Sequence, residues 1–512
     1  MGSGGCHRPP RASRTVAHSF ARSCPGAGEP VADVVLFPGA AGRPSRAAAG
    51  CDAAPQAAMT PPRVVVVERG PGPDATLRSA VAGSDVAVLL PSGAQLDDEQ
   101  LDRLVGAVAA PDGADVAYGD LRLRTGDQEA TVVAPAWSPL RLLGEDYLRG
   151  PVACRTELLE SATDEADPAA WLAVWLRLAE SGARFAHVDA TAEAAGDSAD
   201  AAADVDTVGS QAGLDERIRI VSEQLARSGR DAVVTAATDP RFLRVRLRPP
   251  AGARASLIVP TRGGRGEAFG KQRTFVTEFV RDVAARQYRT DYEWVIVADT
   301  DGPRGYLDEL QAIAGRRLRV VDYDQPFNFA EKCNLGALAA TGDYVVFLND
   351  DMGVITDDWL DALVGLAADS DVGAVGCKLR FDDGSLQHAG HVYDRNHAYH
   401  AYRAMGDDDG IGSELVVDRE VSGVTGATVA QRREAWEAVG GFSEKFPNNY
   451  NDVDYCLKLR LLGLRVIQAN SVELYHFETK TRVNTVRSNE GELMRRRWRH
   501  ELERERYTVF RG

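Results

Sequence analysis

The sequence predicts an α/β protein built on a mixed sheet with flanking helices, and three observations support this. Apolar runs of strand length alternate with helix-length segments over much of the chain. The chain has 512 residues, which is enough for two or three domains. Its hydrophobic content of 44% is ordinary for a globular protein and allows a sizeable core.

The bulk composition narrows the class of protein. A formal net charge of −16 argues against a nucleic-acid-binding protein. No apolar run reaches about 18 residues, so we expect no membrane-spanning helix. The seven cysteines are widely spaced and form no C-x-x-C pair, which suits a reducing cytosol without disulfides or zinc. We expect a cytoplasmic protein and leave peripheral association with the inner face of the plasma membrane open.

Composition divides the chain into five segments. Residues 1–60 are rich in Ala, Gly, Pro, Ser and Arg, so we expect disorder there, and we suspect that translation begins at Met59. Residues 61–200 alternate strand and helix patterns and predict a small α/β domain. The remaining segments are a linker with a helix at 201–250, the main α/β domain at 251–483 and a charged helix at 484–512.

The periodicity of apolar residues predicts the individual elements. In the main domain we expect strands at 255–259, 294–298, 318–321, 344–348 and 373–378, and helices at 272–288, 305–314, 330–340 and 357–368. In the N-terminal half we expect strands at 64–67, 86–90, 116–118 and 184–188, and helices at 97–108, 169–181 and 213–229. Residues 190–212 are rich in Ala, Asp and Gly and predict a linker or surface loop.

The most informative stretch is the buried strand 344–348 and the three residues after it, Asn349, Asp350 and Asp351. Open α/β sheets bind ligands at the carboxyl ends of their strands. Carboxylates together with substrate phosphates are the ligands that Mg²⁺ and Mn²⁺ prefer. The stretch therefore indicates a site for a metal and a nucleotide diphosphate. The alternative is a polar turn in which an Asp starts the next helix.

Other strands also end in polar groups. One strand ends in Pro260, Thr261 and Arg262, and a guanidinium suits a base, a ribose or a phosphate. Asp299 ends a second strand and could accept from a pyrimidine N–H or a ribose hydroxyl, or it could lead an ordinary turn. Lys332 could reach a phosphate, although the pattern favours a solvated helix residue.

Further candidates lie between residues 334 and 476. Asn334 could orient a loop, and the hydrogen-bonding residues Gln387, His388 and Thr425-Gly426 suit sugar hydroxyls, although a lone His is more often structural. Asp452 and Asp454 begin a helix but point to different sides, so at most one faces a reacting centre, and Asp452 could instead cap the helix. His476 follows a strand, and its neutral imidazole would suit Mn²⁺ beside a carboxylate.

In this order the motifs resemble those of the family-2 glycosyltransferases, specifically the surface-polysaccharide type that includes many rhamnosyltransferases. The resemblance covers about residues 254–482. It is carried by Pro-Thr-Arg, Asn-Phe-x₄-Asn-x-Gly, Leu-Asn-Asp-Asp, Gln-His-Ala-Gly, Val-Thr-Gly-Ala, Val-Gly-Gly-Phe, Asn-Asp-Val-Asp-x-Cys-Leu and a late His-x-Glu.

The resemblance implies a Rossmann-like glycosyltransferase-A fold, a divalent cation (Mg²⁺ or Mn²⁺) and inversion at the anomeric carbon. Asp452 would be the catalytic base, and Asn451 stands where the family has Glu. Metal ligands would be Asn349, Asp351 and His476, with Asn349 replacing a frequent Asp. The donor would be bound by Pro260, Thr261, Arg262, Asp299, Lys332, Asn334 and Asp350, and the acceptor by Gln387, His388, Thr425, Gly426 and Asp454.

The N-terminal half resembles a degenerate, shortened second copy of the same domain. It has Pro91-Ser92-Gly93 where carboxylates belong after the strand, and Ala170-Trp171-Leu172-Ala173 where the base helix belongs. Since it lacks both metal oxygens and a base, we expect it to be catalytically inactive and to serve structure or acceptor binding.

We therefore expect a hexosyltransferase-type enzyme whose partners are a nucleotide-sugar donor and a glycan or lipid-linked acceptor, with no nucleic acid. The sugar, with rhamnose among the candidates, and the oligomeric state stay open. One alternative is a nucleotidyltransferase with a phosphate loop at 261–266, which the late Asp452 and His476 disfavour. Another is an inactive scaffold that binds nucleotide sugars or glycans, and Asn349 and Asn451 are its best support.

Overall fold

The structure is a computed structural model of the chain. It describes residues 62–70, 72–73, 75–125, 128–165, 170–195, 211–405, 413–477, 488–503 and 505–507. The chain divides into the units Met1–Thr60 and Pro61–Gly512, and all the described residues belong to the second unit. The expected disorder of residues 1–60, the Met59 start and most of the expected 190–212 loop lie outside the described residues.

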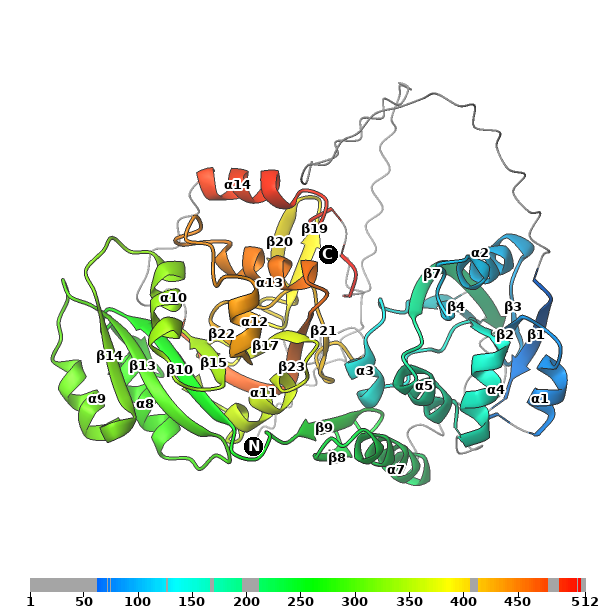
Figure 1. The fold of residues 1–512 in the computed structure, drawn as a ribbon, viewed down its shortest axis with the longest axis horizontal. Helices are drawn as coiled ribbons and strands as arrows, with labels where there is room; N and C mark the ends of the chain where they lie inside the picture. Colours follow the sequence, from blue (N-terminus) through cyan, green and yellow to red (C-terminus); the bar gives the residue numbers. More distant parts are fainter. Residues whose placement is uncertain are drawn as a thin grey trace, which may run out of the picture. The chain divides into compact units, whose positions relative to one another are not determined.

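A ten-stranded mixed sheet forms the centre of the C-terminal part of the chain (Figure 1). Its strand order is β14-β13-β10-β15-β22-β17-β23-β16, with β18 paired to β17 and β21 paired to β23. The strands β14, β13, β10 and β15 are parallel, and β22 is antiparallel to β15. The bounds are β10 (Arg254–Thr261), β13 (Asp291–Asp299), β14 (Leu318–Tyr323), β15 (Tyr344–Leu348), β16 (Met352–Val354), β17 (Val372–Arg380), β18 (Leu386–His388), β21 (Arg419–Glu420), β22 (Thr428–Arg432) and β23 (Arg465–His476).

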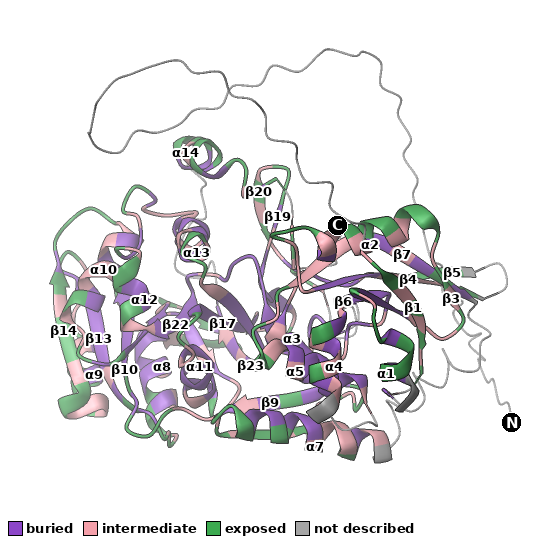
Figure 2. Ribbon diagram, turned by 45° about the vertical axis from the view of Figure 1, so that its right-hand side comes forward, coloured by how far each residue is buried: buried purple, intermediate pink, exposed green. Residues whose placement is uncertain are grey.

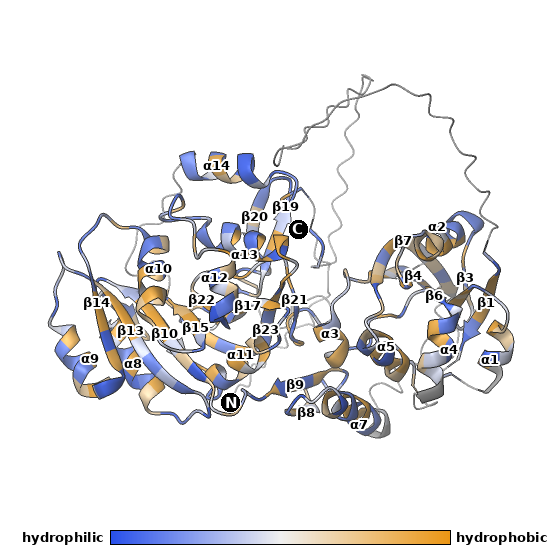
Figure 3. Cartoon of the chain, in the orientation of Figure 1, coloured by the Kyte–Doolittle hydropathy of each residue, from blue (hydrophilic) through white to orange (hydrophobic). Residues whose placement is uncertain are grey.

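Helices cover both faces of this sheet because successive strand residues alternate between two cores. Leu257 and Val346 pack with α8 and α11, whereas Ile258 and Val345 pack with α10, α12 and α13. The central strand β15 is buried and hydrophobic throughout, and the strands of the sheet are largely buried (Figures 2 and 3). The helices are α8 (Phe275–Ala284), α9 (Tyr306–Ala314), η1 (Gly315–Arg317), α10 (Phe329–Ala339), α11 (Trp359–Ala367), α12 (Arg433–Ala438), α13 (Asn451–Leu461) and α14 (Ser488–Trp498).

The structure differs from the predicted elements at several places. The helix expected at 272–288 begins only at Phe275, because Lys271–Thr274 (β12) pairs with Arg265–Ala268 (β11) in a hairpin. Phe269 and Gly270 form its two-residue turn, both at positive φ. A second hairpin, β19 (His391–Asp394) with β20 (His397–His400), follows β18. The charged helix expected over 484–512 is limited to α14 within the described residues.

The N-terminal part forms a seven-stranded sheet of order β1-β2-β6-β4-β7-β3, with β5 paired to β4. Its strands are β1 (Val64–Arg69), β2 (Val86–Pro91), β3 (Ala94–Gln95), β4 (Val116–Thr125), β5 (Gln128–Val132), β6 (Val152–Arg155) and β7 (Phe185–Ala195). Its helices are α1 (Ala75–Val81), α2 (Asp98–Ala109), α3 (Pro139–Gly144), α4 (Thr156–Glu165) and α5 (Trp171–Glu180). No helix among the described residues is long and apolar enough to span a membrane.

The two sheets have the same topology over six strands. The order β1-β2-β6-β4-β7-β3 matches β10-β15-β22-β17-β23-β16 strand for strand. The directions match as well, because β2–β6 and β15–β22 are antiparallel, whereas β4–β7 and β17–β23 are parallel. Within the described residues, the N-terminal sheet lacks counterparts of β13 and β14, the strands at the β14 edge of the larger sheet.

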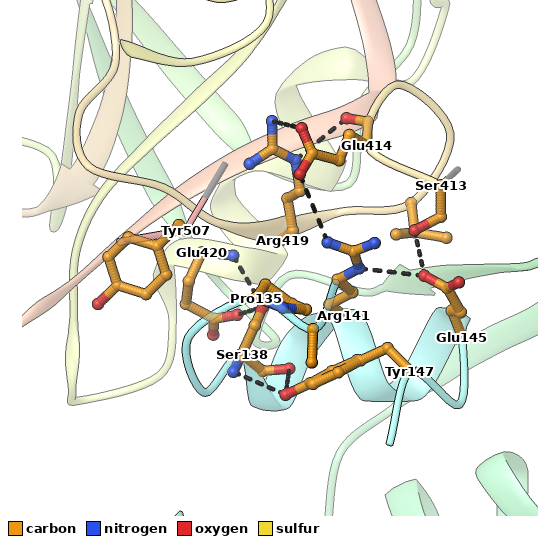
Figure 4. Close-up of polar contacts among 12 residues, drawn as sticks. Pro135, Ser138, Arg141, Glu145, Tyr147, Ser413, Glu414, Arg419, Glu420 and Tyr507 are labelled. Atoms are coloured by element: carbon orange, nitrogen blue, oxygen red, sulfur yellow. Dashed lines mark hydrogen bonds and ion pairs between the residues drawn. The ribbon is translucent and has the colours of Figure 1, made fainter. Parts of the chain in front are cut away.

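The helix expected at 213–229 is α7 (Gln211–Arg227). It is followed by a hairpin that the sequence does not predict, β8 (Ala232–Ala236) with β9 (Leu243–Leu247). Leu243, Val245 and Leu247 alternate with arginines, and their burial explains why β9 is a strand. Buried polar contacts also join α3 to β21 and the residues before it, as Figure 4 shows: Ser138 donates to Glu420, and Arg141 forms an ion pair with Glu414.

Candidate active site

The expected metal ligands meet at the carboxyl end of β15. This strand leads directly into Asn349, Asp350 and Asp351. His476 ends β23 and pairs with Met352 of β16, which brings its ring to the same place. His476 Nε2 lies 2.9 Å from Asn349 Nδ2 and 3.3 Å from Asp351 Oδ1. The structure therefore brings together three residues that the sequence assigns to one metal.

Gln387 fixes the orientation of the His476 ring. Its Oε1 accepts from His476 Nδ1 at 2.6 Å, and its Nε2 donates to the His476 carbonyl oxygen at 3.2 Å. Nδ1 therefore carries a proton, and Nε2 is the ring nitrogen on the side of Asn349 and Asp351. The sequence predicts Gln387 at the acceptor, whereas the structure commits its buried amide to His476, because β18 and β23 pair with the same end of β17.

Asp350 and Asp351 form a pair of adjacent carboxylates. Thr261 Oγ1 donates to Asp350 Oδ2 at 2.6 Å. Removal from water and the negative charge of Asp351 raise the pKa of Asp350 to about 7. A divalent cation would offset this repulsion, and carboxylate oxygens with one imidazole lone pair are a donor set that fits Mg²⁺ or Mn²⁺.

The expected donor-binding residues meet at the ends of β10 and β13. Asp299 Oδ2 lies 3.0 Å from Lys332 Nζ and 3.4 Å from Arg262 Nε. Lys332 is only 1% exposed and also donates to the carbonyl oxygen of Thr261 at 3.4 Å. The solvated position that the sequence favours for Lys332 is therefore wrong, since α10 packs directly on the sheet. Pro260 is a buried residue of β10 and directly precedes Thr261, the last residue of the strand.

Asp452 lies in the first turn of α13 and faces the turn at Thr425-Gly426. Gly426 N donates to Asp452 Oδ2 at 3.0 Å. Tyr450 is the N-cap position and has a left-handed conformation. Asp452 Oδ1 accepts from Val453 N at 2.8 Å, so the side chain also satisfies one free amide of the first turn. The side chain is half-buried. A carboxylate held in this way can accept a proton from a substrate hydroxyl.

Two links join these groups into one set. The Ala427 carbonyl, one residue after the amide that binds Asp452, accepts from Asn349 N at 3.1 Å. On the other side, Thr261 is the common partner of the metal and donor groups. These contacts connect four residues that the resemblance assigns to donor, metal and base, which are Asp299, Asp351, Asp452 and His476.

Two predicted residues serve other contacts. Asn334 holds the backbone of Phe442, accepting from its N at 2.8 Å and donating to its O at 2.9 Å. It therefore orients a loop and does not line the donor side. Asp454 is fully buried and accepts from Trp498 Nε1 at 2.7 Å. It anchors α14 instead of meeting an acceptor, because it points to the side of α13 opposite Asp452.

Sequence reasoning missed two of three clustered histidines. His388 of β18, His391 of β19 and His400 of β20 place ring nitrogens within 4.8 Å of one another. His388 Nε2 also accepts from Thr425 N at 3.2 Å, so the cluster adjoins the turn that binds Asp452. Four of the nine histidines fall within residues 388–400, a concentration that could have indicated the cluster.

Strand register shows what occupies the equivalent positions in the N-terminal sheet. In the N-terminal sheet, Val86 pairs with the last residue of β6. In the larger sheet, Tyr344 pairs with the last residue of β22, so Val86 is equivalent to Tyr344. Independently, Ala94 pairs with Ala194 as Met352 pairs with His476. Both registers give the same equivalences after the strand, which are Pro91 with Asn349, Ser92 with Asp350 and Gly93 with Asp351. The second register also makes Ala194 equivalent to His476.

The mixed sheet with helices on both faces is the fold class expected of a glycosyltransferase-A domain. Residues 256–437 match the sequence model of glycosyl transferase family 2, so the chain carries a family-2 glycosyltransferase domain. The chain is similar to the O-antigen biosynthesis protein RfbC of Myxococcus xanthus, with 32% identity over 369 residues that cover 70% of this chain and 28% of that protein. It is also 31% identical over 297 residues to the uncharacterized protein y4gI of Sinorhizobium fredii, covering 55% of this chain and 32% of the relative. The chain thus spans about a third or less of the length of these relatives.

The chain is also similar to solved structures, two of which are complexes with nucleotide sugars. The mannosyltransferase PcManGT of Pyrobaculum calidifontis, in complex with GDP-Man and Mn²⁺, is 21% identical with a TM-score of 0.33, covering 46% of this chain and 59% of that chain. TarS 1–349 of S. aureus, in complex with UDP-GlcNAc, is 14% identical with a TM-score of 0.34, covering 48% and 66%.

Proposed function

We propose that the protein is an inverting, metal-dependent glycosyltransferase. It would transfer a sugar from a nucleotide-sugar donor to a cell-surface glycan or a lipid-linked acceptor in the cytoplasm. The observation that carries this proposal is the connected set of contacts from Asp299 through Asp351 and His476 to Asp452. It joins a nucleotide side, a metal side and a basic carboxylate within one site.

Each group has a defined part in the reaction. The Asp452 carboxylate accepts the proton that the acceptor hydroxyl loses as its oxygen attacks the anomeric carbon. The bond from that carbon to the diphosphate oxygen breaks, and the nucleoside diphosphate leaves with its electron pair. Mg²⁺ or Mn²⁺, held by Asp351 and His476, would offset the negative charge that develops on the diphosphate. Asp299 and Arg262 would hold the nucleoside.

The N-terminal domain would be non-catalytic. At the positions equivalent to the metal ligands it carries Pro91, Gly93 and Ala194, which offer no side-chain ligand. Its described strands also include no counterparts of β13 and β14, and hence none of the strand that ends in Asp299. A domain without a nucleotide side or metal oxygens can support its neighbour but has no groups for transfer.

The test is a screen of UDP-, dTDP- and GDP-sugars for turnover by the full chain with Mn²⁺ or Mg²⁺. Asp452→Asn should abolish transfer while donor and Mn²⁺ still bind, and Asp351→Ala should lose Mn²⁺ binding as well. Ser92→Ala, at the N-terminal position equivalent to Asp350, is the matched control and should leave turnover unchanged. Donor binding without turnover by the wild-type chain would favour the scaffold alternative. Turnover by an Asp351→Ala/Asp452→Asn double variant would contradict the assignment of the site.

A further inference from the structure

Three histidines form a triangle beside the proposed base. The ring centroids of His388, His391 and His400 lie 5.1, 5.0 and 5.2 Å apart, with the rings nearly perpendicular to one another. His391 and His400 face each other across the β19–β20 hairpin. Neither the predicted site nor the proposed reaction uses His391 or His400.

Backbone amides set the tautomer of His388. Its Nε2 accepts from Gly390 N and from Thr425 N, each at 3.2 Å. A ring nitrogen that accepts hydrogen bonds carries no proton, so the proton of neutral His388 lies on Nδ1. His388 Nδ1 therefore donates to His400 Nδ1, 2.8 Å away. Because His400 accepts at Nδ1, its own proton lies on Nε2.

This hydrogen-bond pattern differs from that of a metal site. An imidazole that binds a metal donates its second N–H to an acceptor, whereas the second nitrogen of His388 faces two donors. A cation at His388 Nδ1 would also displace the proton shared with His400. Burial lowers the pKa of all three rings, so the cluster is neutral around pH 7.

His400 retains one donor that no protein group uses. Within the described part of the chain no partner contacts His400 Nε2, and this atom is not among the enclosed unpaired atoms, unlike Nδ1 of His391. It therefore reaches the surface, in keeping with the half-buried position of His400. The Thr425 amide donates to His388, and the next amide, that of Gly426, donates to Asp452. Since His388 is also hydrogen-bonded to His400, a short chain of contacts connects His400 to the proposed base.

We propose that His400 binds the acceptor saccharide, donating from Nε2 to an oxygen next to the hydroxyl that Asp452 deprotonates. His388 is a positioning residue that keeps His400 in this tautomer. The ligand is a neutral saccharide oxygen, because a neutral N–H in a neutral cluster recognises an acceptor atom without requiring charge. This inference rests on the proposed transferase function.

The test compares His400→Leu with His400→Gln, which keeps an N–H donor, in the full chain. The donor is the nucleotide sugar found by the screen, and the acceptor probes are octyl glycosides. His400→Leu should raise the KM for the acceptor roughly threefold to tenfold, the effect of one lost hydrogen bond. Donor KM and donor hydrolysis by water should be unchanged, and His400→Gln should restore part of the loss. His397→Leu, an exposed residue on the same hairpin, is the matched control.

Two further readouts decide the alternatives. Histidine ¹⁵N spectra should show His388 with its proton on Nδ1, and the other tautomer would overturn the role of His388. A visible Co²⁺ absorption band that His388→Gln removes would show a metal site and overturn the proposal. Turnover with an unchanged acceptor KM in His400→Leu would contradict the inference alone, whereas no turnover by the wild-type chain would contradict the proposed function itself.

Discussion

The side-chain amide of Asn349 donates to His476 Nε2 across 2.9 Å, although 127 residues separate them in the chain. That nitrogen is the one on the side of Asp351, because Gln387 accepts from Nδ1. A cation bound by His476 therefore competes with this hydrogen bond. Asn349 is neutral, so it adds no negative charge beside Asp351. Its hydrogen bond also occupies the imidazole nitrogen that a cation would need.

Replacing Asn349 by Asp should strengthen metal binding. The substitution supplies a charged oxygen ligand next to Asp351, so we expect the Kd for Mn²⁺ to fall roughly tenfold, measured by titration calorimetry. Gln287→Glu adds the same charge at an exposed position before β13 and should leave the Kd unchanged. A weaker or equal affinity in Asn349→Asp would show that this side chain is not at the metal.

Asp350→Asn should change how stability depends on pH. The pKa of Asp350 is raised from 3.8 to about 7 in the folded protein, so between these values the folded state binds more protons than the unfolded state. Its contribution to stability is therefore full below pH 3.8 and is lost as the pH rises through 7. In EDTA, Asp350→Asn should gain roughly 2 kcal/mol over the wild type between about pH 5.5 and 8. Urea denaturation measures this, and a constant difference at both pH values would argue against the shift.

Gly441 and Gly440 offer a matched pair for testing the loop that Asn334 holds. Both have positive φ, but a Cβ at Gly441 would lie 2.4 Å from Asn334 Oδ1, whereas a Cβ at Gly440 would meet nothing within 4 Å. Gly440→Ala should cost about 1 kcal/mol through backbone strain. Gly441→Ala should cost about 1–3 kcal/mol more, since Asn334 must release Phe442. Equal unfolding free energies for the two variants would mean that the Asn334 contact is unimportant.

Glu420 should prove essential to the contact between α3 and the C-terminal sheet. It is 2% exposed and accepts from Ser138 (Figure 4). Its Oε1 also lies 2.6 Å from Arg465 Nη1. Glu420→Ala leaves the half-buried Arg465 guanidinium without one of its carboxylates and the buried Ser138 hydroxyl without its acceptor, and should cost about 2–3 kcal/mol in chemical denaturation. Glu434→Ala removes an exposed partner of Arg432 and should change stability by less than about 1 kcal/mol. Comparable losses in the two variants would refute a special role for this buried contact.

The main strands and the grouping of the metal residues are predictable from the sequence for a clear physical reason. A continuous apolar run such as Tyr344–Leu348 is typical of a buried strand in a parallel sheet, and the residues after such a strand lie at the sheet edge. Asp351 follows such a strand closely, whereas the assignment of His476 to the same metal comes from the resemblance to the family, because β23 contains polar residues. The degenerate N-terminal domain stays a prediction, which the matching strand order supports.

Short elements and side-chain partners are not predictable in the same way. The hairpin of β11 and β12 contains only polar or small residues apart from its turn, so periodicity does not reveal it. The burial of Lys332 depends on Asp299, 33 residues earlier, and no local pattern carries that information. The contact of Gln387 with His476 depends on strand order and not on spacing, so the sequence pattern indicates the acceptor instead.

The position of β23 in the sheet has a consequence for biosynthesis. This strand pairs with β17 and β16 and supplies His476, yet it comes after all the other strands of its sheet in the chain. A nascent polypeptide on the ribosome displays the β15 carboxylates long before it can offer the imidazole. Until β23 is synthesised, the edge of β17 that it pairs with is unpaired and can pair with a strand of a neighbouring nascent chain. We therefore expect protection by chaperones to matter most during this interval.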